Sequence, residues 1–204
     1  MKIVLASNNA GKLAELQALF GPLGCTLIAQ SDLGVPESPE PYKTFVENAL
    51  AKARNAAQHT GLPALADDAG LCVDHFGGLP GVDTAYYATQ FGYPKGDANN
   101  VIALLEQMRG VENRRAALVS TLVAVRAPYD PEPLIAMGRA EGLLTQEPVG
   151  SNGFGFDPVV WIAEFGQTFA QLPVEVKNAN SHRGRAAKIM VQLMRTQWLH
   201  VAAQ

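Results

Sequence analysis

The first twenty residues constrain the fold most, because they read as a buried strand, a polar loop and a helix. Ile3–Ala6 is uniformly apolar, as in a strand buried on both faces. Ser7–Gly11 is polar, and leucines then recur at helical spacing through Lys12–Phe20. Such a loop can hold phosphate on the free backbone N–H groups at the helix start. It is not a Walker loop, which needs Gly where Ala6 stands and Ser or Thr where Leu13 stands.

Lys12 is an unexpected residue for the first turn of a helix, because the helix dipole disfavours a cation there. A solvated lysine would cost about a few tenths of a kcal/mol. An anionic ligand would instead reverse the local preference. We favour the ligand, and expect replacement of Lys12 to weaken its binding with little effect on folding stability.

The last helix repeats this anomaly. Ser181 is a suitable N-cap for a helix that runs from His182 to about Val201. Its first turn contains His182, Arg183 and Arg185, and Lys177 comes shortly before it. Two helix starts crowded with cations indicate a phosphate site.

The adjacent carboxylates Asp67 and Asp68 lie between two apolar runs, Pro63–Leu65 and Leu71–Val73. This predicts that one buried strand ends, and the next begins, at the pair. Gly70 suits a turn, so on these residues alone a turn and a site are equally good interpretations. Neighbouring side chains on an extended chain point to opposite faces, so only one of the two should enter a shared cleft. Carboxylates suit Mg²⁺, which typically bridges protein oxygens to substrate phosphates.

Other patterns predict two more helices and a hairpin. Thr44 and Glu47 match a capping box. Besides a second short strand over 26–29, the predicted elements are a helix over 45–59, a helix over 98–108 with Asp97 as N-cap, and a hairpin of strands 116–127 and 133–144.

The segment Gly150–Pro158 is a glycine-rich loop with two aromatics and an acid. Phe154 or Phe156 could stack on a flat ring. Both could equally plug the core beneath a surface loop, and this second reading is favoured for the loop taken alone.

Composition limits the class of protein. The chain has 204 residues, 48% of them hydrophobic and 17% charged, which fits one folded domain. A net charge of -3 argues against a broad nucleic-acid-binding surface. Cys25 and Cys72 form no CxxC pair and are expected to be buried reduced thiols. The N-terminal apolar run is too short for a signal peptide, and no run could span a membrane, so we expect a cytoplasmic protein.

Five segments in order resemble motifs of the inosine triphosphate pyrophosphatase family, at matching spacing over essentially the whole chain. They are Ser7-Asn8-Asn9-Ala10-Gly11-Lys12, Thr44-Phe45-Val46-Glu47-Asn48-Ala49, Ala66-Asp67-Asp68-Ala69-Gly70-Leu71, Phe154-Gly155-Phe156-Asp157-Pro158 and Ser181-His182-Arg183.

The resemblance implies an α/β fold with a long curved mixed β-sheet and helices that form two lobes around a nucleotide-binding cleft. It implies a single domain over 1–204, and hydrolysis of ITP, dITP and XTP to the monophosphate and pyrophosphate. It also implies a Mg²⁺-dependent homodimer. No nucleic-acid or membrane partner is expected, because of the net charge and the absence of a membrane-spanning run noted above.

The same resemblance assigns roles to residues. Asp68 would bind the metal and activate the attacking water, with Glu40 as the second metal carboxylate and Glu37 as the alternative. The segment 7–12 and Lys177 would hold phosphates. The substrate-binding set is Ser7, Asn8, Asn9, Ala10, Gly11, Lys12, Ala69, Phe154, Gly155, Phe156, Asp157, Lys177, His182 and Arg183. His182 and Arg183 would lie at the base and ribose end, whereas the charge pattern alone gives them to phosphate.

Departures from the family pattern are Ala69 in place of Ser, Phe156 in place of Tyr and Tyr86 in place of Arg. The helix rich in Arg and Glu that marks Nudix hydrolases is absent from the sequence. A Maf-type pyrophosphatase and a non-catalytic nucleotide sensor are the alternatives. The retained pair Asp67-Asp68 and Lys12 favour catalysis over a sensor.

Overall fold

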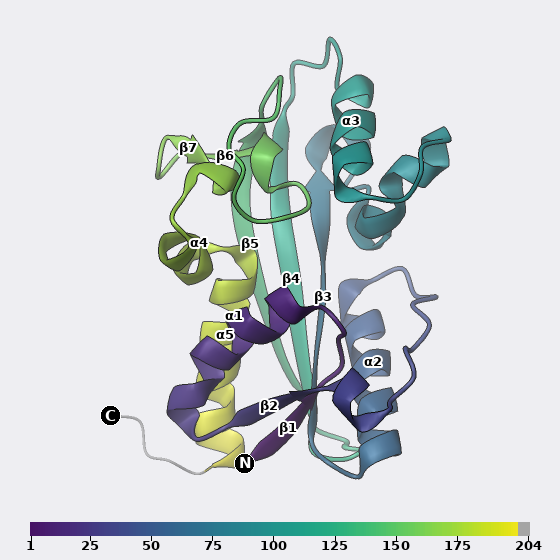
Figure 1. The fold of residues 1–204 in the computed structure, drawn as a ribbon, viewed down its shortest axis with the longest axis vertical. Coiled ribbons are helices and arrows are strands. Elements are labelled where there is room, and N and C mark those ends of the chain that lie inside the picture. Colours follow the sequence, from purple (N-terminus) through teal and green to yellow (C-terminus); the bar gives the residue numbers. More distant parts are fainter. Residues whose placement is uncertain (200–204) are drawn as a thin grey trace. The chain divides into compact units, whose positions relative to one another are not determined.

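The computed structural model describes residues 1–199. The strands are β1 (Lys2–Leu5), β2 (Thr26–Ala29), β3 (Ala64–Val73), β4 (Arg115–Val125), β5 (Leu134–Leu144), β6 (Val160–Ile162) and β7 (Gln167–Thr168). The α-helices are α1 (Ala10–Phe20), α2 (Phe45–Thr60), α3 (Asp97–Gln107), α4 (Val174–Asn180) and α5 (His182–Leu193). The other helical elements of residues 1–199 are 3-10 segments, the longest over Gly81–Phe91, and a π-helical segment, Met194–Trp198 (Figure 1).

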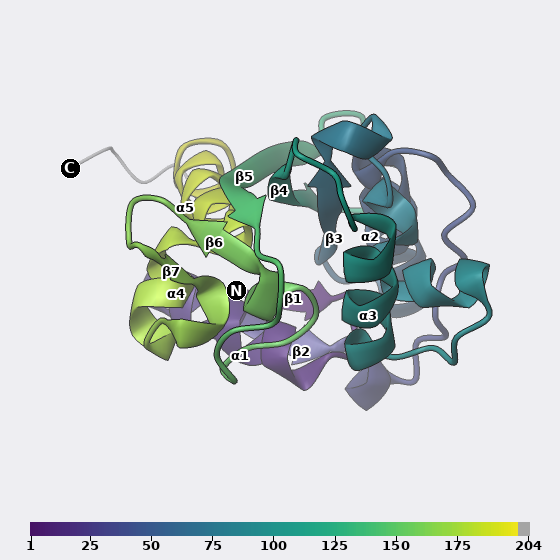
Figure 2. The ribbon, with the colours of Figure 1, turned by 90° about the horizontal axis from the view of Figure 1, so that it is seen from above.

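The strands form one mixed sheet in the order β2-β1-β3-β4-β5-β6-β7. β1 pairs in parallel with both β2 and β3, whereas β6 pairs antiparallel with β5 and β7. Figure 2 shows β6 beside β5, with β7 and α4 beyond it. The predicted α/β class with a mixed sheet is therefore confirmed.

The chain divides into two compact units. Unit 1 holds 1–68, 120–138 and the C-terminal segment from Arg183, and unit 2 holds 69–119 and 139–182. Three strands, β3, β4 and β5, begin in one unit and end in the other.

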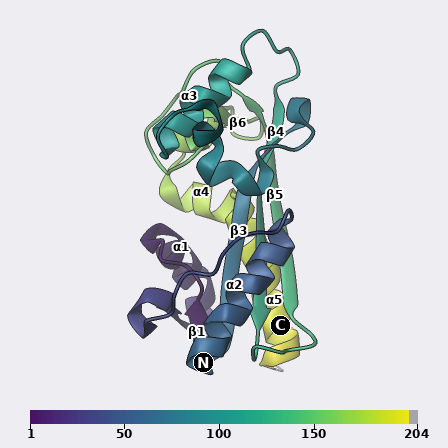
Figure 3. The ribbon, with the colours of Figure 1, turned by 90° about the vertical axis from the view of Figure 1, so that its right-hand side faces the viewer.

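In unit 1, the alternation of side chains along each strand sorts the core into two layers. Ile3 and Leu5 pack with Leu16 of α1 and Met190 of α5. Val4 and Ala6 face the other way and pack with the alanines of α2. The helices α1 and α5 therefore cover one face of this part of the sheet and α2 covers the other (Figure 1). Figure 3 shows α2 running alongside β3.

In unit 2, a separate core joins β3, β4, β5 and β6 to α3. Leu71 and Val73 of β3 pack in this core with Val101 and Leu104 of α3. Phe156 also belongs to it. This core anchors both α3 and the glycine-rich loop in unit 2.

Several sequence predictions are confirmed. The helices over 10–20 and 45–60, the strands at 2–5 and 26–29, and the two strands of the hairpin all appear within a few residues of their predicted bounds. Both cysteines are free thiols as predicted, and Cys25 is buried, but Cys72 is only half-buried where full burial was expected.

Four details were wrong or incomplete. No strand ends at Asp67-Asp68, because β3 continues through the pair and through Gly70 to Val73. The N-cap of α3 is Gly96, and Asp97 is its first residue. The Thr44 hydroxyl accepts from Glu47 N and donates to the Glu47 carboxylate, so Glu47 does not close the box on the backbone N–H of Thr44. Lys177 comes before the last helix as predicted, but it lies in a helix of its own, α4, which was not predicted. The predicted end of that last helix, Val201, lies outside the described residues.

Candidate active site

The two carboxylates of β3 diverge, as the extended geometry predicts. Asp67 shares the sheet face of Leu65 and points toward α1 and α5, where Lys12 and Arg183 meet it. Asp68 shares the face of Ala66 and points toward α2, where Lys52 meets it. The pair therefore serves two separate networks within unit 1.

Asp67 is the centre of the first network and is 1% exposed. Its Oδ2 lies 2.9 Å from Lys12 Nζ and accepts from Arg183 Nε at 3.0 Å, and its Oδ1 accepts from Ser120 Oγ at 2.6 Å. Arg183 also donates through Nη1 to Glu15 at 2.9 Å. Burial alone would raise the pKa of Asp67, but the charges of Arg183 and Lys12 outweigh it and hold that pKa far below its ordinary value.

This network corrects the expectation for Lys12. The lysine has a carboxylate partner inside the protein, so its position in the first turn of α1 has a structural cause. Removal of Lys12 should cost stability as well as anion binding, because a buried carboxylate loses one of its charged partners.

Asp68 is the centre of the second network. Lys52 Nζ donates to Asp68 Oδ1 at 2.7 Å, to Glu40 Oε1 at 3.2 Å and to the backbone oxygen of Asp67 at 3.2 Å. These three acceptors match the three protons of the ammonium. Burial raises the pKa of Asp68 above its ordinary value, and the charge of Lys52 offsets this only in part. A carboxylate with a raised pKa is a better proton acceptor, which suits a general base.

The second carboxylate oxygen of Asp68, Oδ2, is buried and has no hydrogen-bond partner among residues 1–199. A buried carboxylate oxygen without a partner is costly, which indicates that something outside the protein completes the site.

Sequence reasoning missed Lys52. Its signal is its spacing, because Lys52 follows Ala49 by three residues and precedes Ala56 by four, on the stripe of α2 that faces the sheet. A lysine on an otherwise apolar stripe needs a buried partner, and Asp68 supplies it.

Glu40 and Glu37 are also distinguished by their contacts. Glu40 shares Lys52 with Asp68, whereas Glu37 accepts a hydrogen bond from Asn8 Nδ2 at 2.7 Å. The contact through Lys52 supports Glu40 as the second carboxylate near Asp68, and ties Glu37 to the loop that precedes α1.

The loop before α1 is built as a helix start. Asn9 caps α1, its Oδ1 accepting from Lys12 N at 3.0 Å, and Ser7 Oγ accepts from Asn9 N at 3.2 Å. Asn8, Ala10 and Gly11 are exposed. The loop thus presents polar groups and a helix N-terminus to solvent, an arrangement that suits phosphate.

The remaining predicted residues belong to unit 2. Asp157 is buried; its Oδ2 accepts from Phe154 N at 2.9 Å and lies 2.6 Å from Lys177 Nζ. The same ammonium lies 4.8 Å from the centre of the Phe154 ring, a cation–π geometry. Phe154 is 39% exposed, so its ring is accessible for stacking. The ring of Phe156 is buried in the core, as the core-packing alternative predicts, so it does not offer a face for stacking.

Two further predicted residues lie at unit boundaries. Ala69 follows Asp68 on β3 as the first residue of unit 2, and His182 is buried at the start of α5. The predicted set is therefore brought together as two groups. Unit 1 contains 7–12, Glu40, Asp68 and Arg183, and unit 2 contains Ala69, 154–157, Lys177 and His182.

The donors around Asp68 fit a hard divalent cation. Residues 1–199 hold no cluster of three or more His, Cys, Asp or Glu side chains that could bind a metal alone. Mg²⁺ usually takes one or two protein carboxylates and completes its shell with water and substrate phosphates. Asp68, with its free buried oxygen, and Glu40 provide such an incomplete set.

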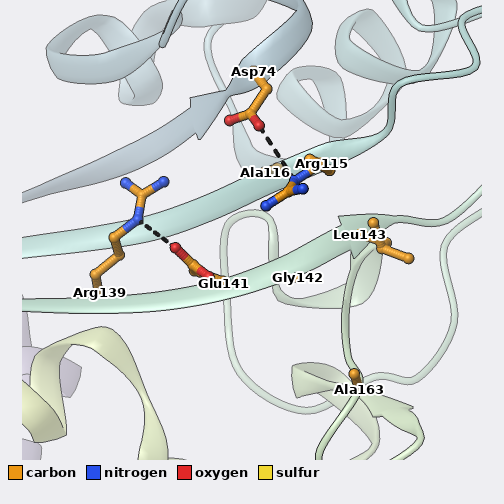
Figure 4. Close-up of a pocket in the computed structure, with 8 residues that line it drawn as sticks. All are labelled: Asp74, Arg115, Ala116, Arg139, Glu141, Gly142, Leu143 and Ala163. Atoms are coloured by element: carbon orange, nitrogen blue, oxygen red, sulfur yellow. Dashed lines mark hydrogen bonds and ion pairs between the residues drawn. The ribbon is translucent and has the colours of Figure 1, made fainter.

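A cavity of about 270 Å³ lies elsewhere in unit 2 and is lined mainly by residues of β4 and β5 (Figure 4). Its charged walls are two ion pairs, Arg115 with Asp74 at 3.5 Å and Arg139 with Glu141 at 3.2 Å. These charges balance, so the cavity does not favour a polyphosphate, and none of the predicted site residues lines it.

Comparison with known proteins gives the family of this chain. The model of the Ham1 family matches residues 3–193, nearly the whole chain. This chain belongs to the Ham1 family. It is 76% identical over 199 residues to the dITP/XTP pyrophosphatase of Albidiferax ferrireducens, with 98% of this chain and 100% of that protein covered. It is 52% identical to the dITP/XTP pyrophosphatase of Leptothrix cholodnii, with 99% and 100% covered.

Solved structures of the Ham1 family share the fold. The HAM1 protein from Coxiella burnetii superposes with a TM-score of 0.90 at 40% identity, covering 96% of this chain and 99% of that one. The Staphylococcus aureus Ham1 protein superposes with a TM-score of 0.86 at 32% identity, covering 97% and 100%.

Proposed function

We propose that this chain hydrolyses the non-standard purine nucleoside triphosphates dITP, XTP and ITP. The observation that carries the proposal is the buried Asp68, which has a raised pKa and an oxygen without a protein partner. Membership of the Ham1 family and the names of the relatives supply the substrate class.

The reaction adds water across the anhydride between the α and β phosphates. Asp68 accepts a proton from the water as the water oxygen attacks the α-phosphorus. The bond from that phosphorus to the bridging oxygen breaks, and pyrophosphate leaves. The products are the nucleoside monophosphate and pyrophosphate.

Other residues hold the substrate. Lys12 and the N–H groups at the start of α1 bind phosphate oxygens, and Lys52 keeps the Asp68 carboxylate oriented. Phe154 offers a ring face to the purine. Lys177 donates a hydrogen bond to the polar edge of the purine or to a phosphate. We assign Mg²⁺ to Asp68 and Glu40; when bound, it would neutralise charge on the phosphates.

Pyrophosphate release from dITP, XTP, ITP, GTP and ATP, with and without Mg²⁺, tests the proposal. We expect fast release from the first three, slow release from GTP and ATP, and loss of activity with a chelator. The physical basis is a pocket that pairs with a 6-oxo purine and leaves the amino group of guanine or adenine poorly paired. Comparable turnover of GTP and ITP would contradict the specificity. Tight binding without pyrophosphate release would indicate a sensor.

We extend the proposal to a homodimer that acts in the cytoplasm, where nucleotides are made and used. The homodimer rests on the family resemblance, and the cytoplasmic location is the expectation drawn from the amino-acid sequence. Within residues 1–199, no helix is long and apolar enough to cross a membrane. Size-exclusion chromatography coupled to light scattering would give the mass of the protein in solution. A monomer at micromolar concentration would contradict the dimer.

A further inference from the structure

The glycine-rich loop of unit 2 is fastened at two points. On its inner side the buried Asp157 accepts the N–H of Phe154 and pairs with Lys177. On its outer side the N–H of Gly155 donates to Asp97 Oδ2 at 2.8 Å. Consecutive N–H groups are therefore held by two carboxylates from different parts of the chain.

The outer contact comes from a distant element. Asp97 is the first residue of α3 and lies 58 positions before Gly155. The helix is a firm support, because Val101 and Leu104 pack in the core and the buried Asn100 accepts from Ala88 N at 2.8 Å. Asp97 is exposed, so its carboxylate is not needed to fill the core.

The contact acts on the peptide that orients Phe154. Gly155 has φ +61, a conformation that glycine adopts without strain. The Asp97 carboxylate holds the N–H of this peptide, and the same peptide carries the carbonyl of Phe154, which accepts from Asp157 N at 3.3 Å. A charge-assisted hydrogen bond to a backbone N–H is stronger than a neutral one. Without it, this turn would be held only by the contacts with Asp157.

We propose that Asp97 is a positioning residue for the nucleotide, acting through the loop 154–157. It touches no reacting atom; it fixes the backbone from which Phe154 and Asp157 present their groups to the purine. This inference rests on the proposed function, and extends it to a residue outside the motifs of the sequence.

The first test needs no substrate. Hydrogen–deuterium exchange of the free protein is followed in peptides covering 150–158, for the wild type and Asp97→Ala. We expect faster exchange of the Gly155 amide in the variant and unchanged exchange in β4. Unchanged exchange at Gly155 would overturn the proposal whether or not the protein is an ITP pyrophosphatase.

The second test is kinetic. We expect Asp97→Ala to raise KM for ITP about three- to tenfold, as loss of one exposed charge-assisted hydrogen bond implies, and to change kcat less than about twofold. Asp97→Asn retains an acceptor oxygen and should recover part of the KM. A change in kcat alone, or no recovery with Asn, would overturn the positioning role.

Glu106→Ala is the matched control. It removes another exposed carboxylate of α3, one that accepts from the Tyr93 hydroxyl at 2.8 Å. We expect its KM to match the wild type. An equal rise in KM in both variants would assign the effect to α3 as a whole and overturn the proposal. A wild type inactive on ITP would reject the proposed function, while the exchange test would still decide whether Asp97 holds the loop.

Discussion

At the scale of single residues, Asp67 and Asp68 are neighbours with different tasks. Asp68→Asn removes the proposed base and keeps the shape, so we expect a folded protein whose ITP turnover falls about 10²–10⁴-fold. The measurement is pyrophosphate release at saturating Mg²⁺, with circular dichroism as the check on folding. A folded variant that keeps more than about a tenth of the turnover would show that Asp68 is not the base.

Asp67→Asn should behave in the opposite way. It leaves the buried Arg183 and the half-buried Lys12 without their shared carboxylate. Breaking a buried ion pair from one side typically costs about 3–5 kcal/mol, so the main effect should be on the free energy of unfolding. Urea denaturation measures it. An unchanged stability would show that solvent or Glu15 compensates both cations.

Lys12→Met gives an intermediate result. Asp67 keeps Arg183 and Ser120, so we expect a loss of about 1–3 kcal/mol together with a raised KM for ITP. Lys2→Met on β1 removes an exposed lysine and is the control for net charge. If Lys12→Met alters KM while stability matches the control, the ion pair with Asp67 contributes nothing and the lysine serves only the ligand.

At the scale of elements, Asp67 of β3 joins α1 to α5 through Lys12 and Arg183. Its pKa in the folded state lies below the unfolded value of about 3.9. The stability from the ionised carboxylate is therefore complete above about pH 5 and is lost as pH falls toward the folded pKa. We expect the free energy of unfolding to fall more steeply between about pH 5 and pH 2.5 in the wild type than in Asp67→Asn.

In the turn between β4 and β5, a second carboxylate stabilises the fold when it is ionised, so its contribution is also lost at low pH. The hydrogen bonds from Arg126 lower the pKa of Asp130 to about 2. Urea unfolding at several pH values, for the wild type, Asp67→Asn and Asp130→Asn, separates the two terms. Parallel curves for the wild type and Asp67→Asn would contradict the assignment for Asp67.

At the scale of the whole molecule, the two units share three continuous strands. A strand cannot melt in one unit without disturbing its ladder in the other, so we predict a single domain with one cooperative unfolding transition. Calorimetry and circular dichroism should give the same midpoint, with equal calorimetric and van't Hoff enthalpies. Two resolved transitions would show that the units are separate domains.

The sequence alone determined what depends on local pattern. Leucine spacing located α1, the Thr44–Glu47 capping pattern located α2, apolar runs located β1 and β2, and five motifs in order identified the family and hence the mixed α/β fold. The alternation of an extended chain also predicted that Asp67 and Asp68 would diverge. Each of these features depends on a few neighbouring residues, so residue spacing and local propensity are sufficient to predict it.

Only the tertiary structure decided the partners. The sequence patterns predicted the end of a strand at Asp67-Asp68. They could not show that three cations, Lys12, Lys52 and Arg183, would pair with these two carboxylates inside a continuous β3. The partner of Lys52 and the contact of Asp97 with Gly155 were missed for the same reason. The spacing of Lys52 on α2 marks it as a buried cation but does not name its partner, because contacts between residues 16 to 116 positions apart arise only when strands and helices pack together.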